Sequence, residues 1–234
     1  MTGASFIQKI LSLLYPAKCA GCGVAGPSYY CEQCQTTLVR ISFPICQTCG
    51  YPLDAPLQSC HQCKIHPLRH LNTIRSLAFF EDTSLRPAIH QFKYQNLRAV
   101  ADDFALLLQE CYVTHQLETD VIIPVPLHKS RLRERGYNQS ALLAQSLSKL
   151  IDLPVNTKSI IRRRNTKSQV SVKAAERQNN VAGAFHCVSD SLSQQSILLV
   201  DDVCTTGATL NACAQALRQI NVPVIHGLTL ARAR

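Results

Sequence analysis

The stretch ILLVDDVCTTGATL, residues 197–210, decides the fold of this chain. It consists of an apolar run, two adjacent acids, a loop rich in Thr and Gly, and the start of a helix. A continuous apolar run is typical of a strand buried on both faces, as in a parallel sheet. Open sheets of this kind bind ligands at the carboxyl ends of their strands. The stretch therefore predicts a ligand site directly after residue 200.

The loop after this strand has the chemistry of a phosphate site. Its backbone amides, with the free N–H groups at the start of the following helix, form a positively polarised nest. Gly207 lets the chain approach a phosphate closely. Further donors are the hydroxyls of Thr205, Thr206 and Thr209. The loop therefore predicts a site for a monophosphate.

The acid pair suggests what the phosphate is attached to. Asp201 and Asp202 can accept hydrogen bonds from two adjacent ribose hydroxyls, so that strand end and loop together hold a ribose 5-phosphate. The alternative is a buried acid pair that caps a helix. The pattern lacks the GKS or GKT ending of a P-loop and contains no GxGxxG, so neither a nucleoside triphosphatase nor a dinucleotide-binding protein is supported.

The flanking sequence predicts the rest of an α/β domain. Apolar runs predict strands at 76–80, 121–125 and 224–230. Helical spacing of apolar residues predicts two helices between 85 and 110, one over 138–151 and one over 209–220. Strands that alternate with helices predict a parallel sheet flanked by helices. We assign this domain to residues 71–234, after a Cys-rich module at residues 1–70.

That module contains four Cys-x-x-Cys pairs, separated by 8, 11 and 10 residues. Two residues between thiols let one tight turn aim both sulfurs at a tetrahedral metal ion. Eight thiols complete two closed zinc sites, and the ligands are Cys19, Cys22, Cys31, Cys34, Cys46, Cys49, Cys60 and Cys63. The short spacers favour sequential pairing in a double zinc ribbon over an interleaved cross-brace. The module is either a docking surface or a metal staple that replaces a core.

Charge is concentrated in one part of the chain. Residues 121–180 contain twelve Lys and Arg against three Asp and Glu, which equals the whole formal excess of +9. Such a stretch points to a polyanionic ligand, either phosphates or nucleic acid, although a solvated basic loop is the alternative. No apolar run reaches eighteen residues, so we expect a cytoplasmic protein without membrane insertion.

The ordered motifs of the chain resemble a known family. They are the four Cys pairs, IHQFKY at 89–94, IPVPLHKSRLRERGYNQS at 123–140, RRRNTKSQ at 162–169, ERQNNVAGAF at 176–185 and the loop at 201–209. The last of these resembles the signature of type I phosphoribosyltransferases. Taken together, the series resembles the ComF/GntX family of competence-associated proteins over essentially the whole chain.

The resemblance implies roles for particular residues. Asp201 and Asp202 would hold the ribose hydroxyls of phosphoribosyl pyrophosphate (PRPP), and the turn at 127–135 would be its pyrophosphate loop. Residues 162–177 would be a flexible catalytic loop that brings Arg164 and Arg177 to the reaction. The ligand-binding residues would be Val203, Cys204, Thr205, Thr206, Gly207, Ala208 and Thr209, with Lys129, Arg131, Arg133 and Arg135 for the pyrophosphate.

The resemblance also implies a function. The chain would be a PRPP-binding protein that works with Mg²⁺ and transfers a pentosyl group, with a base-selecting hood built from residues of about 71–95. It would act in DNA uptake and natural transformation, with single-stranded DNA and a competence helicase as partners. The alternative is a sensor of the phosphoribosyl ligand, or a DNA-binding adaptor, that uses the same fold without catalysis.

Overall fold

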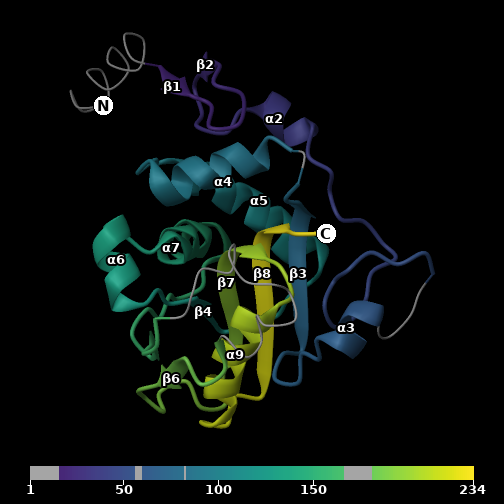
Figure 1. Ribbon diagram of the computed structural model, residues 1–234, viewed down its shortest axis with the longest axis vertical. Helices are drawn as coiled ribbons and strands as arrows, with labels where there is room; N and C mark the ends of the chain where they lie inside the picture. Colours follow the sequence, from purple (N-terminus) through teal and green to yellow (C-terminus); the bar gives the residue numbers. More distant parts are fainter. Residues whose placement is uncertain (1–15, 56–59, 82, 166–180) are drawn as a thin grey trace.

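The computed structural model describes residues 16–55, 60–81, 83–165 and 181–234. Its centre is a four-stranded sheet in the order β3-β8-β7-β4 (Figure 1). The strands are β3 (Thr73–Phe79), β4 (Val121–Pro124), β7 (Ser196–Cys204) and β8 (Val224–Arg232). Every neighbouring pair in this sheet is parallel, which confirms the predicted fold class.

The apolar runs form strands that are buried on both faces, because both faces of the sheet are covered. In β7, Leu198 and Val200 enter one buried cluster, whereas Ile197 and Leu199 enter the other. Successive side chains of a strand point to opposite faces, so an uninterrupted apolar run fits only a sheet that is covered on both sides.

Helices cover the two faces unequally (Figure 1). The first buried cluster joins the sheet to α4 (Leu85–Tyr94), α5 (Val100–Thr114) and α7 (Gln139–Ile151). The second cluster joins it to α9 (Ala208–Arg218) and to an antiparallel hairpin of β5 (Ile160–Arg162) and β6 (Phe185–Cys187). A short helix, α6 (Lys129–Arg135), follows β4.

The two Cys-rich ribbons lie on different parts of the domain. The first contains β1 (Ala17–Lys18), β2 (Ala25–Gly26) and α2 (Glu32–Thr36), and Figure 1 shows it above α4. The second contains α3 (His61–Ile65) and lies beside β3. Each ribbon contributes buried residues to one of the two clusters of the sheet domain. The division at residue 70 therefore stays a prediction about independent folding.

Two local expectations change, and one hairpin was not predicted. Most of the turn expected at 127–135 is the helix α6, capped by the His128 ring at its start and by Gly136 at its end. Residues 73–79 form an edge strand of the sheet, so only the following helix α4 remains available for a hood. The hairpin of β5 and β6 has strands too short to give a periodic signal. Within the described residues, no helix has the length and apolarity needed to span a membrane.

Candidate functional site

The acid pair lies near the carboxyl end of β7, where the sequence places it. Asp202 is buried and Asp201 is half-buried. The strand continues to Cys204, and Gly207 then precedes the first residue of α9. Both acids therefore stand at the edge of the sheet at which open α/β folds bind ligands.

Asp201 is held by the start of α7. The Asn138 side chain caps this helix and donates to the carbonyl of Val125 at 3.0 Å, which fixes the helix beside β4. Ser140 in the first turn donates its hydroxyl to Asp201 Oδ1 at 2.8 Å. Burial, and then the charge of Asp202, raise the pKa of the Asp201 carboxyl to about 6. Asp201 is therefore ionised at neutral pH but titrates within two units of it.

Asp202 has a partner that the sequence did not reveal. Lys93, in the last turn of α4, places its Nζ 2.8 Å from Asp202 Oδ1. The Asp202 side chain is 4% exposed, and its Oδ2 has no hydrogen-bond partner in the described part of the chain. One oxygen of this buried carboxylate is thus paired, and the other is buried without a hydrogen-bond partner among the described residues.

The loop after the acids has the backbone that a phosphate nest requires. Gly207 has a φ of +80° and is the N-cap of α9. The Thr206 hydroxyl accepts from the Ala208 amide at 3.4 Å. Six of the predicted loop residues line one small hollow next to Asp201: Val203, Cys204, Thr205, Gly207, Ala208 and Thr209.

Gly207→Ala is expected to destabilise the protein by about 1–3 kcal/mol, because an alanine is strained at this φ. Its Cβ would also lie 2.8 Å from Ile74 Cδ1 and 3.0 Å from Leu68 Cδ2. Urea unfolding measures the change, with Gly26→Ala as the control, since that Cβ meets nothing within 4 Å. Equal stabilities of the two variants would contradict the proposed strain.

Some of the predicted basic residues lie beside the two aspartates, and others do not. Arg131 and Arg135, four residues apart on one face of α6, line a cavity of about 130 Å³ together with both aspartates. Lys129 and Arg133 are exposed and line neither this cavity nor the second cavity described below, and their contacts with a pyrophosphate stay a prediction.

Arg162 also lines the cavity, and its guanidinium lies over the Phe185 ring at 5.3 Å. Burial, and then the nearby charge of Arg131, lower its pKa from the usual high value. Arg164 is exposed and does not line the cavity. Arg177 lies outside the described residues, so its catalytic role stays a prediction.

A second cavity of about 540 Å³ adjoins the first. The two share Lys93, Tyr94, Arg131 and Arg135. Arg135 lies over the Tyr94 ring at 5.2 Å, so α4 and α6 meet across the boundary. A larger space therefore adjoins the cavity that contains the acid pair.

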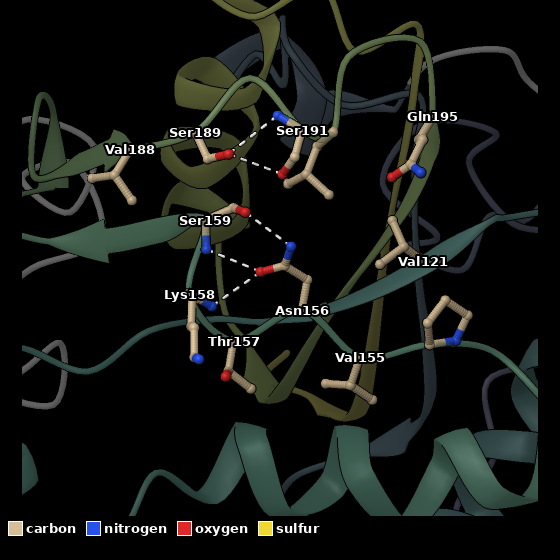
Figure 2. Close-up of a pocket in the computed structure, with 12 residues that line it drawn as sticks. Val121, Val155, Asn156, Thr157, Lys158, Ser159, Val188, Ser189, Ser191 and Gln195 are labelled. Carbon is tan, nitrogen blue, oxygen red and sulfur yellow. Dashed lines mark hydrogen bonds between the residues drawn. The ribbon is translucent and has the colours of Figure 1, made fainter.

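A larger cavity of about 720 Å³ lies elsewhere, at the amino end of β4 around Val121 (Figure 2). Its polar side chains mostly bind their own turns: Asn156 accepts from the amides of Lys158 and Ser159, and Ser189 donates to Ser191. Among the described residues, Lys158 is the one charged residue that lines it. This cavity therefore lies at the opposite end of the sheet from the acid pair.

The eight predicted thiols form two clusters. One contains Cys19, Cys22, Cys31 and Cys34, and the other contains Cys46, Cys49, Cys60 and Cys63. Their closest Sγ–Sγ distances are 3.6 Å for Cys19–Cys34 and 3.4 Å for Cys49–Cys60. Four sulfurs about 2.3 Å from one tetrahedral zinc lie about 3.8 Å apart. The clusters therefore fit two zinc ions and confirm the sequential pairing.

The second ribbon reaches the phosphate loop through a buried arginine. Arg232, which is 3% exposed, donates from Nη1 to the Cys49 carbonyl at 2.6 Å. The same Nη1 lies 3.8 Å from Cys204 Sγ, at the end of β7. Ile74 donates its amide to the Thr48 carbonyl at 2.7 Å and packs on Gly207. The knuckle at 46–50 therefore supports the loop from behind.

Two family models match the chain. A double zinc ribbon domain matches residues 10–64, and a phosphoribosyl transferase domain matches residues 92–234. Among solved structures, an allosteric regulatory enzyme of purine biosynthesis aligns with 59% of this chain and 29% of its own. Its TM-score of 0.39 and identity of 16% are too low to add to this assignment.

Curated relatives match most of the chain. Competence protein F of Haemophilus influenzae is 36% identical over 87% of this chain and 90% of its own. DNA utilization protein YhgH of Escherichia coli K12 is 31% identical over 86% and 89%. Competence protein ComFC of Bacillus subtilis is 30% identical over 80% and 77%. The chain therefore belongs to the ComF family, with a double zinc ribbon joined to a phosphoribosyl transferase domain.

Proposed function

We propose that this chain binds PRPP at the carboxyl edge of its sheet and acts in the uptake and handling of DNA. One observation carries the first part: Asp201, Asp202, Arg131, Arg135 and Arg162 line a single cavity beside the phosphate loop. Paired carboxylates suit ribose hydroxyls, and grouped guanidinium groups suit a pyrophosphate.

The ligand would lie across the end of β7. Asp201 and Asp202 accept hydrogen bonds from the two ribose hydroxyls. The 5-phosphate lies at the amino end of α9, where backbone amides and threonine hydroxyls donate to it. The geometry that supports this arrangement is the left-handed turn at Gly207, which leads directly into that helix.

The reaction proposed for this site is transfer of the pentosyl group. The bond between C1 of the ribose and the pyrophosphate oxygen breaks, the pyrophosphate leaves with the electron pair, and a nucleophile attacks C1. Arg131 and Arg135 stabilise the negative charge that develops on the leaving group. Mg²⁺ bound to the PRPP would supply further charge neutralisation, and an acid pair that can orient the ribose hydroxyls is compatible with it.

Calorimetric titration of the full chain with PRPP, with and without Mg²⁺, tests the binding. Pyrophosphate release is then measured against a panel of bases, amines and single-stranded DNA. Release with one acceptor alone identifies a transferase, whereas PRPP binding without release with any of them supports a sensor. Absence of PRPP binding under all conditions contradicts the proposal.

The second part rests on the relatives and on charge. The similar proteins carry the names competence protein and DNA utilization protein. The formal charge excess of this chain lies within residues 121–180. The structure divides the arginine run there: Arg162 lines the cavity, whereas Arg163 and Arg164 are exposed. We therefore assign the two exposed arginines to single-stranded DNA, as part of the wider basic stretch.

Changing Arg163 and Arg164 to alanine is expected to weaken single-stranded DNA binding and to flatten its salt dependence. Each lost phosphate contact lowers the slope of log affinity against log salt by roughly 0.7, so two contacts lower it by about 1.4. Fluorescence anisotropy at several salt concentrations measures the slope.

The matched control removes two exposed charges outside residues 121–180, by Arg69→Ala with Arg86→Ala. It should leave the slope nearly unchanged. An unchanged slope in the arginine variant would place the DNA on another surface. If DNA extends from these arginines into the cavity, PRPP should also compete with it.

A further inference from the structure

Lys93 holds an unusual position for a lysine. It lies at the end of α4, yet its ammonium group reaches β7 and pairs with Asp202 at 2.8 Å. The Lys93 side chain is 22% exposed. It lines both the cavity that contains the acid pair and the neighbouring cavity. Lys93 therefore stands at the junction of the two spaces that the proposed reaction requires.

The helix that carries Lys93 is fixed on its other side. Phe92, the preceding residue, is fully buried and packs edge to face on Phe104 of α5. Gln91 donates to the Ala20 carbonyl in the first zinc ribbon at 3.0 Å. Both contacts restrain the last turn of α4, so the ammonium group is presented to Asp202 from a rigid support.

Two adjacent carboxylates near a buried strand end need a compensating charge. The charges on Asp201 and Asp202 repel one another, and burial disfavours ionisation of Asp201. Charged and titratable groups from five elements face Asp201 and Asp202: Lys93 from α4, Arg131 and Arg135 from α6, Arg162 from β5, the Cys204 thiol from β7 and the Cys213 thiol from α9. Of these, Lys93 contacts a carboxylate oxygen directly.

The geometry also shows what remains for a ligand. Lys93 occupies Asp202 Oδ1, and Ser140 occupies Asp201 Oδ1. Each carboxylate is thereby held in one orientation. Asp202 Oδ2 is buried and has no hydrogen-bond partner among the described residues. A lysine that neutralises and orients the pair on one side prepares it to accept hydroxyl donors on the other.

We propose that Lys93 is a positioning residue that keeps the Asp201–Asp202 pair ionised and oriented for the ribose hydroxyls, and so sets the lower pH limit of ligand binding. This role rests on the proposed function, because PRPP is the ligand that the pair would hold. Under this proposal, the FKY segment at 92–94 contributes to the ligand site through Lys93.

The test compares Lys93→Met, which removes the charge at similar length, with Lys93→Arg, which keeps it. PRPP affinity of the full chain is measured by calorimetry between about pH 5 and pH 8, with Mg²⁺ present. For the wild type, affinity is full at neutral pH and falls as the pH drops through about 6, since the raised pKa of Asp201 lies there.

Loss of an opposite charge at this distance moves a carboxyl pKa upward by about 1–3 units. The midpoint for Lys93→Met should therefore move to higher pH, with affinity at pH 7 lowered by roughly 2- to 90-fold. Lys93→Arg should restore the wild-type midpoint. Lys149→Met, which removes an exposed charge on α7, is the matched control and should change nothing.

A second readout does not depend on PRPP. The carboxyl carbons of aspartate are labelled with ¹³C and titrated by NMR, and the two site signals are assigned through Asp201→Asn and Asp202→Asn. Lys93→Met should raise the titration midpoint of Asp201. A merely structural role would lower affinity equally at every pH and leave this titration unchanged, which would overturn the proposal. If wild-type protein fails to bind PRPP, the proposed function fails, and the carboxyl titration still decides whether Lys93 controls ionisation.

Discussion

Asp201→Asn combined with Asp202→Asn is expected to lower PRPP affinity by roughly 10²- to 10⁴-fold. Each carboxylate accepts a hydrogen bond from a ribose hydroxyl, and a bond to a charged group contributes about 1.5–3 kcal/mol. Two such bonds contribute about 3–6 kcal/mol, and each 1.4 kcal/mol corresponds to a tenfold change in affinity. Calorimetry at pH 7.5 measures the loss.

The fold should survive this change. Asparagine has nearly the same shape as aspartate, and its amide oxygen can still accept from Lys93 and Ser140. Thermal unfolding and zinc content verify that the variant is folded. Asp54→Asn with Asp190→Asn, which alters two exposed acids, is the control and should keep full affinity. Unchanged affinity in the site variant would mean that the ribose site has been assigned to the wrong residues.

The central part of the site could be predicted from sequence because its signals are local. The apolar run, the two acids and the glycine follow one another within residues 197–210. A strand, its end and the start of the next helix are set by residues adjacent in the chain. The order of these residues in the sequence therefore predicts how they are arranged in space. The Cys pairs are local in the same sense, since each pair needs one turn and the short spacers favour the sequential pairing.

The remaining site residues depend on packing between distant segments. Lys93 meets Asp202 across more than a hundred residues, and Ser140 meets Asp201 across sixty-one. Charge alone also could not show that Arg131 and Arg135 line the cavity whereas Lys129 and Arg133 do not. In a helix, residues four apart lie on the same face, but the family resemblance implied a turn in this segment.

Arg232 was missed for a related reason. It lies on β8, near the end of the chain, and reads as an ordinary terminal charge. In the fold it is buried between the second ribbon and the end of β7, in contact with the Cys49 carbonyl. Arg232 therefore links the second zinc site to the end of β7 that precedes the phosphate loop, and no local sequence pattern indicates this link.

Cys46→Ser is accordingly expected to remove one zinc and with it the binding of ribose 5-phosphate. A structural zinc contributes about 10–16 kcal/mol of apparent binding energy, which is as large as the whole stability of a typical domain, about 5–15 kcal/mol. The knuckle at 46–50 should therefore unfold. Ile74 would then lose its hydrogen bond to the Thr48 carbonyl and its contact with Gly50. Arg232 would lose its hydrogen bond to the Cys49 carbonyl. The contacts that support Gly207 would therefore be lost.

Cys19→Ser should also remove one zinc, but it releases a different part of the molecule. The first ribbon binds Asp103 of α5 through the amides of Tyr29 and Tyr30, away from the phosphate loop. This variant should therefore keep more affinity for ribose 5-phosphate than Cys46→Ser does. Cys111→Ser, at a buried cysteine of α5 outside both clusters, is the control and should keep two zinc ions.

Metal analysis and ribose 5-phosphate titration of the three variants together test whether the second zinc ribbon supports ribose 5-phosphate binding more than the first. The coupling requires that Cys46→Ser lose phosphate affinity by a larger factor than Cys19→Ser at the same zinc content of one ion per chain. Equal losses would contradict a specific coupling between the second ribbon and the loop at Gly207. Full affinity in Cys46→Ser with one zinc would show that the loop holds its shape without the ribbon, because its own backbone at Gly207 and the amino end of α9 would then suffice.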